Sequence, residues 1–301
     1  MLHSNLVELI GNTPLVEMPR LSPRQGIRLF AKLEGQNPSG SLKDRIALYM
    51  VERAEKRGDL RPGMTLLEAT SGNTGVALAM IARIKGYPIK VVMPDNVSIE
   101  RTLVMRAFGA QVVHTDGARY TDGAIERMAA MAAEDPSCFP VSQFANQDNP
   151  LAHYETTGPE ILRDMPEMDV FLAGSGTGGT VSGVGRFLKE RRPNVKVICV
   201  EPQPDSLIEG LHTLSGFNPP VFDENAVNEH IVVTQEEAFS ATRELALTEG
   251  IFGGVSSGAV LHAARLVAKR FERANIVLLM GDGGWKYLST SIWRQDAEDD
   301  G

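Results

Sequence analysis

Short apolar runs alternate with segments of helical period along most of this chain, and this alternation constrains the fold more than any other feature. In the first half, we expect strands at 65–69, 89–93 and 111–114 and helices at 75–85, 99–108 and 122–133. After a break, we expect strands at 169–173, 195–201 and 276–280 and helices at 180–190, 235–249 and 258–271. Strands separated by helices of about 10 to 15 residues form parallel βαβ units. The sequence therefore predicts an α/β fold.

The composition is that of an ordinary globular protein. The 301 residues are 43% hydrophobic and 23% charged, which is enough chain for two domains or one large α/β unit. The net charge is −8 and no basic block is present, so we expect no nucleic-acid partner. No segment approaches the roughly 20 apolar residues of a membrane span, and no signal-peptide pattern is seen. Cys138 and Cys199 have no histidine at metal-ligand spacing, so we expect no metal site and a reducing, cytoplasmic location.

A tight turn, Asn-Pro-Ser-Gly-Ser at residues 37–41, precedes Lys43 at the expected first turn of a helix. A lysine acts as a nucleophile when its amine is presented to a carbonyl group and is partly desolvated, because desolvation lowers its pKa. A single lysine at a helix start is more often a solvated surface residue. Lys43 differs from that case because three other turns rich in glycine and hydroxyl groups recur at strand-to-helix junctions.

The glycine turn after the strand expected at 169–173 has two interpretations. Gly174, Gly176 and Gly179 match the pattern G-x-G-x-x-G, and the next expected strand ends at Glu201, where a Rossmann fold places its ribose-binding acid. Taken alone, this pattern favours a nicotinamide dinucleotide such as NAD. In physical terms the turn predicts less, because backbone N–H groups and hydroxyls at a helix N-terminus stabilise a phosphate of any kind.

Two more turns of the same kind complete the pattern. Residues 68–75, Glu-Ala-Thr-Ser-Gly-Asn-Thr-Gly, offer four hydroxyl and amide groups at a helix start, which suits a carboxylate. Residues 253–259 place two serines before a helix, where capping is the simple interpretation for either one. An imine-forming lysine, a phosphate cradle and a carboxylate site together predict pyridoxal phosphate and an amino-acid substrate. NAD leaves Lys43 unexplained.

These motifs resemble those of the cysteine synthase family, whose members are fold type II pyridoxal phosphate enzymes. The resemblance runs from residues 9–15 to residues 287–290, and residues 93–96 and 148–160 resemble the B type in particular. It implies two domains of the tryptophan synthase β kind, each an open twisted sheet flanked by helices. Residues 40–145 are expected to form the smaller, mobile domain, and residues 1–39 together with 146–301 the larger domain.

The resemblance also implies roles for individual residues. Lys43 would hold the cofactor as an internal aldimine and then remove the substrate α-proton, while Asn73 would bond the 3′-oxygen of the ring. Ser256 would face the ring nitrogen, and a neutral hydroxyl there makes a weak electron sink that favours β-elimination. The expected phosphate-binding residues are Gly176, Thr177, Gly178, Gly179 and Thr180. The expected substrate-binding residues are Thr70, Ser71, Gly72, Thr74 and Gln143.

The implied activity is cysteine synthesis. O-Acetylserine or O-phosphoserine would form a bound aminoacrylate, to which sulfide, thiosulfate or a protein thiocarboxylate would add sulfur. A cystathionine β-synthase-like activity and a serine/threonine dehydratase activity stay open on the same fold. A NAD-binding oxidoreductase that uses the Gly174 turn and Glu201 is the alternative from another class. The expected partners are these small molecules and a second copy in a homodimer, with no membrane.

Two positions depart from the family pattern. His212 lies in the segment where B-type relatives often carry an arginine, and Lys286 belongs to a pair that varies among relatives. Because no guanidinium occupies this segment, a substrate or sulfur donor with an extra anionic group is less expected. His212 could substitute for that arginine, and Lys286 could pair with an anionic donor. For both side chains the favoured expectation is a position at the protein surface.

Overall fold

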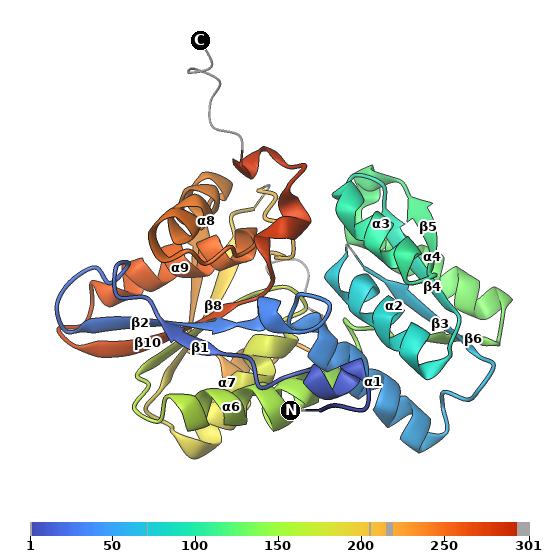
Figure 1. Ribbon diagram of the computed structural model, residues 1–301, viewed down its shortest axis with the longest axis horizontal. Helices are drawn as coiled ribbons and strands as arrows, with labels where there is room; N and C mark the ends of the chain where they lie inside the picture. Colours follow the sequence, from blue (N-terminus) through green and yellow to red (C-terminus); the bar gives the residue numbers. More distant parts are fainter. Residues whose placement is uncertain (1, 71, 205, 215–218, 294–301) are drawn as a thin grey trace, which may run out of the picture.

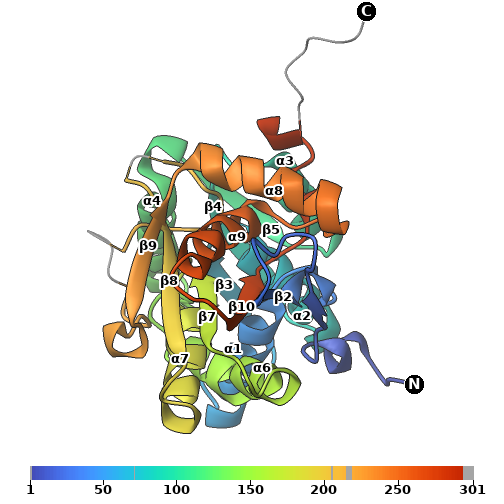
Figure 2. The same cartoon turned by 90° about the vertical axis from the view of Figure 1, so that its left-hand side faces the viewer.

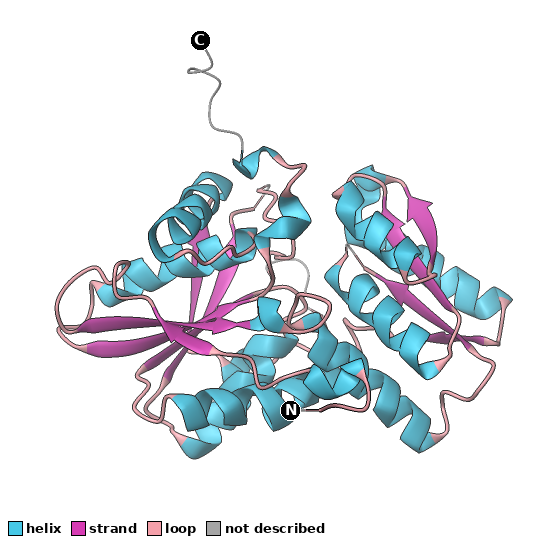
Figure 3. Cartoon of the chain, viewed as in Figure 1, coloured by secondary structure: helices cyan, strands magenta, loops and turns pink. Residues whose placement is uncertain are grey.

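The computed structural model contains two sheets, each covered by helices, in two lobes that lie side by side (Figure 1). It describes the whole chain except residues 1, 71, 205, 215–218 and 294–301. Among the described helices, none combines the length and apolar character that crossing a membrane requires. The prediction of an α/β fold with two open sheets flanked by helices is confirmed (Figure 3).

The larger sheet has the strand order β1-β2-β10-β7-β8-β9, and its neighbouring strands are parallel except for the β1–β2 pair. Its strands are β1 (Leu15–Glu17), β2 (Ile27–Leu33), β7 (Val170–Gly174), β8 (Lys196–Pro202), β9 (Glu229–Val233) and β10 (Ala274–Met280). One core layer packs this sheet against α8 (Gln235–Glu249) and α9 (Val255–Ala268). A second layer packs it against α6 (Gly158–Asp164) and α7 (Gly179–Arg191), on the opposite face (Figure 2).

The smaller sheet has the strand order β5-β4-β3-β6 and is parallel throughout. Its strands are β3 (Thr65–Ala69), β4 (Ile89–Pro94), β5 (Gln111–Thr115) and β6 (Cys138–Pro140). The helices around it are α1 (Lys43–Arg57), α2 (Asn73–Lys85), α3 (Ile99–Ala107) and α4 (Tyr120–Glu134). The first three share one apolar layer, while α4 packs on the other face.

Helix α1 begins at Lys43, as the turn before it predicts. Its buried apolar side chains recur at helical spacing and join the core of the smaller sheet: Ile46, Ala47, Met50, Val51 and Ala54. The helix ends at Arg57, and its C-cap residue Gly58 adopts the left-handed conformation that favours glycine. Packing of this face fixes the helix and therefore the place of Lys43 at its first turn.

Candidate active site

One pocket lies where the carboxyl ends of β3 and β7 approach the first turns of α1, α2, α7 and α9. Ligand sites in open α/β sheets commonly lie beyond the carboxyl ends of the strands. The predicted site residues that line it are Lys43, Thr70, Asn73, Thr74, Gln143, Gly176, Thr177, Gly178, Thr180 and Ser256. Gly72 and Gly179 belong to the same two loops without lining the pocket, and Ser71 lies outside the described residues.

The turn at residues 37–41 fixes the position of Lys43 through hydrogen bonds between Ser39 and Asp44, the residue that follows Lys43. Asp44 accepts hydrogen bonds from the backbone N–H of Ser39, at 2.7 Å, and from the Ser39 hydroxyl. Lys43 is half-buried and lines the pocket. Desolvation lowers the pKa of its amine to about 8, against the opposing charge of Asp282. About a tenth of this amine is therefore neutral and nucleophilic at pH 7, far more than for a lysine with its ordinary pKa.

The loop between β7 and α7 forms a cradle of glycines and hydroxyls at a helix N-terminus. The Thr177 hydroxyl accepts bonds from the backbone N–H of Gly179, at 3.2 Å, and from the side-chain amide of Asn149, at 3.0 Å. A Cβ on Gly176 would lie 2.9 Å from the carbonyl oxygen of Gly210 and 3.7 Å from the Lys43 Nζ. The cradle thus admits only glycine at position 176 and suits a phosphate close to Lys43.

His153 supports the same cradle from the interior. Its Nε2 lies 3.1 Å from the Thr180 hydroxyl, and its Nδ1 lies 2.9 Å from the Thr157 hydroxyl. Burial and the charges of Arg45 and Lys43 hold the pKa of His153 well below its ordinary value, so the ring is neutral. Residue chemistry alone does not identify Asn149 or His153. The only signal in the sequence is the family resemblance of the stretch that contains them.

The loop between β3 and α2 is braced internally and against α3. The Thr74 hydroxyl donates to Gln143 Oε1 at 2.6 Å, and the backbone N–H of Gly72 donates to the Thr70 hydroxyl at 3.0 Å. Gly72 has a φ of +153°, and a Cβ there would lie 2.1 Å from Cδ of Arg101. These contacts hold the hydroxyls of Thr70 and Thr74 beside the start of α2, where hydroxyl donors suit a small carboxylate.

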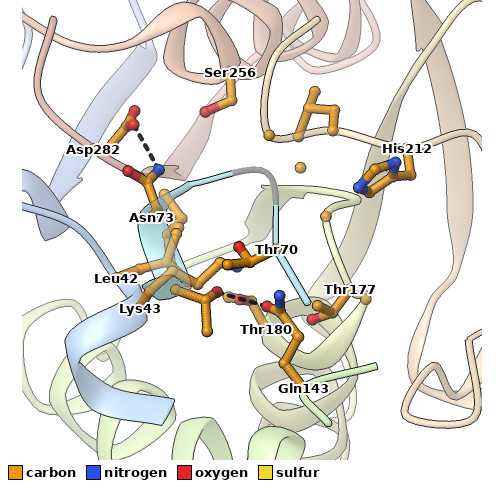
Figure 4. Close-up of a pocket in the computed structure, with 18 of the residues that line it drawn as sticks. Leu42, Lys43, Thr70, Asn73, Gln143, Thr177, Thr180, His212, Ser256 and Asp282 are labelled. Atoms are coloured by element: carbon orange, nitrogen blue, oxygen red, sulfur yellow. Dashed lines mark hydrogen bonds between the residues drawn. The ribbon is translucent and has the colours of Figure 1, made fainter. Parts of the chain in front are cut away.

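Ser256 approaches the pocket from α9, across from Lys43 and Thr70 (Figure 4). The helix begins earlier than expected, at Val255, with Gly254 as its N-cap and no side-chain capping bond. The capping interpretation of the serines is therefore wrong. A Cβ on Gly281 would lie 3.4 Å from the Ser256 hydroxyl, so the hydroxyl sits beside the end of β10.

Asn73 contacts two residues from the far end of the chain. Its Nδ2 donates to Asp282 Oδ2 at 2.8 Å (Figure 4), and its Oδ1 accepts from Lys286 Nζ at 2.8 Å. The prediction that Lys286 lies at the surface is wrong, because the residue is 2% exposed. The short helix η6 (Gly284–Tyr287) folds back toward α2 and α3, so Lys286 points inward while Trp285 covers it.

His212 also lies in the site, contrary to the surface prediction. It is half-buried and lines the pocket (Figure 4). Desolvation, with a contribution from the charge of Lys43, lowers its pKa to about 4, so it is neutral near pH 7. Arg101 lines the same pocket, and its buried guanidinium forms a 2.7 Å ion pair with Glu209. Sequence reasoning does not identify Arg101, because α3 approaches this loop only in the folded chain.

Glu201 does not belong to this pocket. Its carboxylate bonds His230 Nδ1 at 2.5 Å and the backbone N–H of Leu214 at 2.7 Å, and it lines a separate cavity. The acid that the dinucleotide interpretation requires is therefore directed away from Lys43. The β8–β9 register also places His230 opposite Cys199, so three metal-ligating atoms lie within 4.8 Å of one another. Sequence spacing does not reveal this cluster, because its members lie on two strands.

Comparison with known proteins agrees with this geometry. The model of the family "pyridoxal-phosphate dependent enzyme" matches residues 6–282. The chain therefore belongs to the pyridoxal-phosphate dependent enzymes, and its cofactor is pyridoxal phosphate. The residues fit that group, since a desolvated amine for its aldehyde and a glycine cradle for its phosphate share one pocket.

Individual relatives narrow the class to the cysteine synthase family, as the sequence predicts. Cysteine synthase B of Salmonella typhimurium is 44% identical over 295 residues, which covers 97% of both chains. A hydrogen sulfide-producing enzyme of Fusobacterium nucleatum has a TM-score of 0.92 at 42% identity and covers 95% of this chain and 100% of its own. Cysteine synthase of Entamoeba histolytica has a TM-score of 0.93 at 36% identity, covering 99% of this chain and 93% of its own.

Proposed function

We propose that this protein makes L-cysteine by replacing the β-substituent of an activated serine ester with sulfur. The observation that carries the proposal is the half-buried amine of Lys43, which shares one pocket with a glycine cradle and a carboxylate loop. The names of the similar proteins, cysteine synthase B and cysteine synthase, support the same activity.

Bound pyridoxal phosphate would supply an aldehyde that captures amines and a ring that withdraws electrons from the substrate α-carbon. In this proposal Lys43 binds the cofactor and then acts as the base that takes the α-proton. Thr70, Ser71, Gly72, Thr74 and Gln143 bind the substrate carboxylate and so orient the α-C–H bond toward Lys43. Ser256 would face the ring nitrogen as a neutral hydroxyl, which would favour departure of the β-substituent.

Gly176 to Thr180 bind the phosphate in the same proposal. The five-residue segment combines backbone donors with the Thr177 and Thr180 hydroxyls, which Asn149 and His153 orient. A neutral His153 adds no charge of its own, so the phosphate dianion is stabilised mainly by hydrogen bonds and by the helix N-terminus.

We further propose sulfide and O-acetylserine as the preferred pair of substrates. His212 is neutral near pH 7, and the charge of Arg101 is balanced by Glu209 at 2.7 Å. A dianion such as thiosulfate, or the phosphate group of O-phosphoserine, would lose its hydration shell in this pocket. His212 and the Arg101–Glu209 pair offer no net positive charge to compensate for that loss. A small sulfur donor and an ester whose acyl group is uncharged in the bound substrate avoid that cost.

The test measures cysteine formation by the purified protein with each ester and each sulfur donor. We expect kcat/KM for sulfide to exceed that for thiosulfate at least tenfold, and Lys43→Ala to abolish turnover while Lys56→Ala, on the exposed face of α1, retains it. Equal use of thiosulfate would contradict the donor proposal. Cystathionine from homocysteine, or pyruvate release as the main product, would assign one of the alternative activities instead.

The location, assembly and motion of the protein are also proposals. Cys138 and Cys199 are buried free thiols, which supports a reducing cytoplasm. The family resemblance supports a homodimer, which light scattering of the purified protein would test. It also supports the division into a mobile domain at 40–145 and a larger domain at 1–39 and 146–301. Limited proteolysis with and without substrate would test that division.

A further inference from the structure

The Asn73 amide is held from both sides by residues that follow β10. Lys286 Nζ donates to its oxygen at 2.8 Å, and its nitrogen donates to Asp282 Oδ2 at 2.8 Å. Asp282 Oδ2 also accepts from the Tyr287 hydroxyl at 2.8 Å, which fixes the carboxylate in turn. Asp282 and Lys286 are 3% and 2% exposed, so water does not compete for these bonds.

The chemistry of the two neighbours leaves the amide only one orientation. An ammonium group donates hydrogen bonds and never accepts them, whereas a carboxylate only accepts them. Turning the Asn73 amide over would set its N–H₂ against the ammonium and its oxygen against the carboxylate. The bonds to Lys286 and Asp282 are its only ones to the part of the chain that the structure describes. One N–H of Asn73 therefore remains as a donor in the pocket.

The cost of burying Lys286 indicates that its position serves this contact. A buried ammonium is unfavourable unless it is paired and hydrogen-bonded. Lys286 is near the charges of Asp282 and Asp44, it lies under the ring of Trp285 at 5.1 Å, and its backbone carbonyl accepts from the Ser98 hydroxyl. Even so, desolvation lowers its pKa to about 8. Its one side-chain hydrogen bond within the described chain is the bond to Asn73.

We propose that Lys286 and Asp282 are positioning residues that lock the Asn73 amide with its nitrogen toward the ring oxygen of bound pyridoxal phosphate. The inference rests on the proposed role of Asn73. The ammonium also polarises the amide, because hydrogen bonds in a chain strengthen one another. Asn73 then becomes a stronger donor, and the ring oxygen is favoured in its ionised form. Lys286 would thereby act on the electronic state of the cofactor without touching it.

Two substitutions of Lys286, one of Asp282 and one control test this lock. Lys286→Met removes the donor while keeping the length of the side chain, Lys286→Arg keeps a cation that only donates, and Lys56→Met changes an exposed lysine of α1 as the matched control. The readouts are the dissociation constant of the cofactor from the apoprotein and the position of the cofactor absorption band across pH. Asp282→Asn provides a second test, because an amide at 282 no longer forbids the turned-over orientation of Asn73.

We expect Lys286→Met to weaken cofactor binding about tenfold. We also expect it to move absorbance from the visible band toward the near ultraviolet, with Asp282→Asn acting in the same direction. Lys286→Arg and Lys56→Met should keep the visible band of the unchanged protein. An unaltered band and affinity in Lys286→Met, or an Arg variant that behaves like the Met variant, would overturn the inference. If the unchanged protein itself takes up no cofactor, the proposed function fails instead.

Discussion

The pKa of Lys43 controls how readily the apoprotein captures its cofactor. Only the neutral amine attacks an aldehyde, and desolvation places the pKa of this amine at about 8. We expect the rate of pyridoxal phosphate capture to rise about tenfold per pH unit below pH 8 and to level off above it. Stopped-flow absorbance from pH 6 to pH 9 measures this profile. A rate that still climbs tenfold per unit at pH 9 would mean that the amine is not desolvated.

Gly72 is a position where the site has no room for a side chain. Its φ of +153° opposes any other residue, and a Cβ added there would lie 2.1 Å from Arg101 Cδ. We expect Gly72→Ala to lower kcat/KM for O-acetylserine about 100-fold through displacement of the carboxylate loop. Gly86→Ala is the matched control, because Gly86 also has a positive φ but meets no atom within 4 Å. It should lose about 1 kcal/mol of stability and keep its kinetics.

At the residue scale, the sequence predicts those pocket side chains that lie within the four glycine- and hydroxyl-rich turns. Lys43, Thr74 and Ser256 are predictable because each lies in a local turn whose chemistry is readable from its neighbours. Asp282 and Lys286 are not, since they reach Asn73 only after β10 and η6 return to the smaller sheet. The surface prediction for Lys286 is wrong because it rests on the usual solvation of a lone lysine.

At the element scale, a buried charge cluster joins β2, α1 and α6. Glu160 accepts from Lys32 at 2.9 Å and from Arg45 at 2.7 Å, while Arg45 also bonds Glu34 at 2.7 Å. Lys32 and Arg45 are almost fully buried, so each needs its carboxylate partner. Arg45 belongs to the first turn of α1, two residues after Lys43, so the cluster anchors the turn that carries Lys43.

Removal of the Glu160 charge should destabilise the protein. We expect Glu160→Gln to lower the free energy of unfolding by about 3 kcal/mol at pH 7, because two buried cations lose a partner. The pKa of Glu160 falls to about 2, through bonds and charges that outweigh desolvation. Its contribution is therefore complete above about pH 4.5 and is lost as the pH falls toward 2, so the variant and the unchanged protein should converge in acid.

Urea unfolding of both proteins at pH 7 and in acid measures this difference. Glu126→Gln is the matched control, because Glu126 pairs with Arg119 at the exposed surface of α4 and should change stability by less than about 1 kcal/mol. A Glu160 variant as stable at pH 7 as the Glu126 variant would show that the cluster does not stabilise the fold.

Some of the strands that the sequence pattern misses have no continuous apolar period. The strand β2 is not predicted, because Arg28 and Lys32 interrupt its apolar run. Lys32 is nevertheless fully buried, and only its pairing with Glu160, far along the chain, makes that position tolerable. The short strand β6 is also missed, since three residues carry too little period to detect. Uninterrupted segments such as β3 and α8 match the prediction to the residue.

At the scale of the whole molecule, the smaller sheet and the C-terminal segment meet around the site. Glu100 of α3 accepts from the backbone N–H and the hydroxyl of Ser289, both at 2.8 Å, and Arg101 reaches Glu209 of the larger lobe. Asn73 and Asp282 join the two lobes at the pocket itself. The family resemblance predicts two lobes, but these contacts depend on side chains that lie close only after both sheets have formed.

The visible absorption spectrum of the purified protein, recorded before and after addition of O-acetylserine, tests the central claim most directly. We predict a yellow protein whose visible band depends on Lys43 and moves to longer wavelength when O-acetylserine is added. Such a change would support the cofactor, the lysine and the ester together. A colourless protein that takes up no added pyridoxal phosphate, or a yellow protein whose band does not respond to the ester, would contradict the proposed reaction.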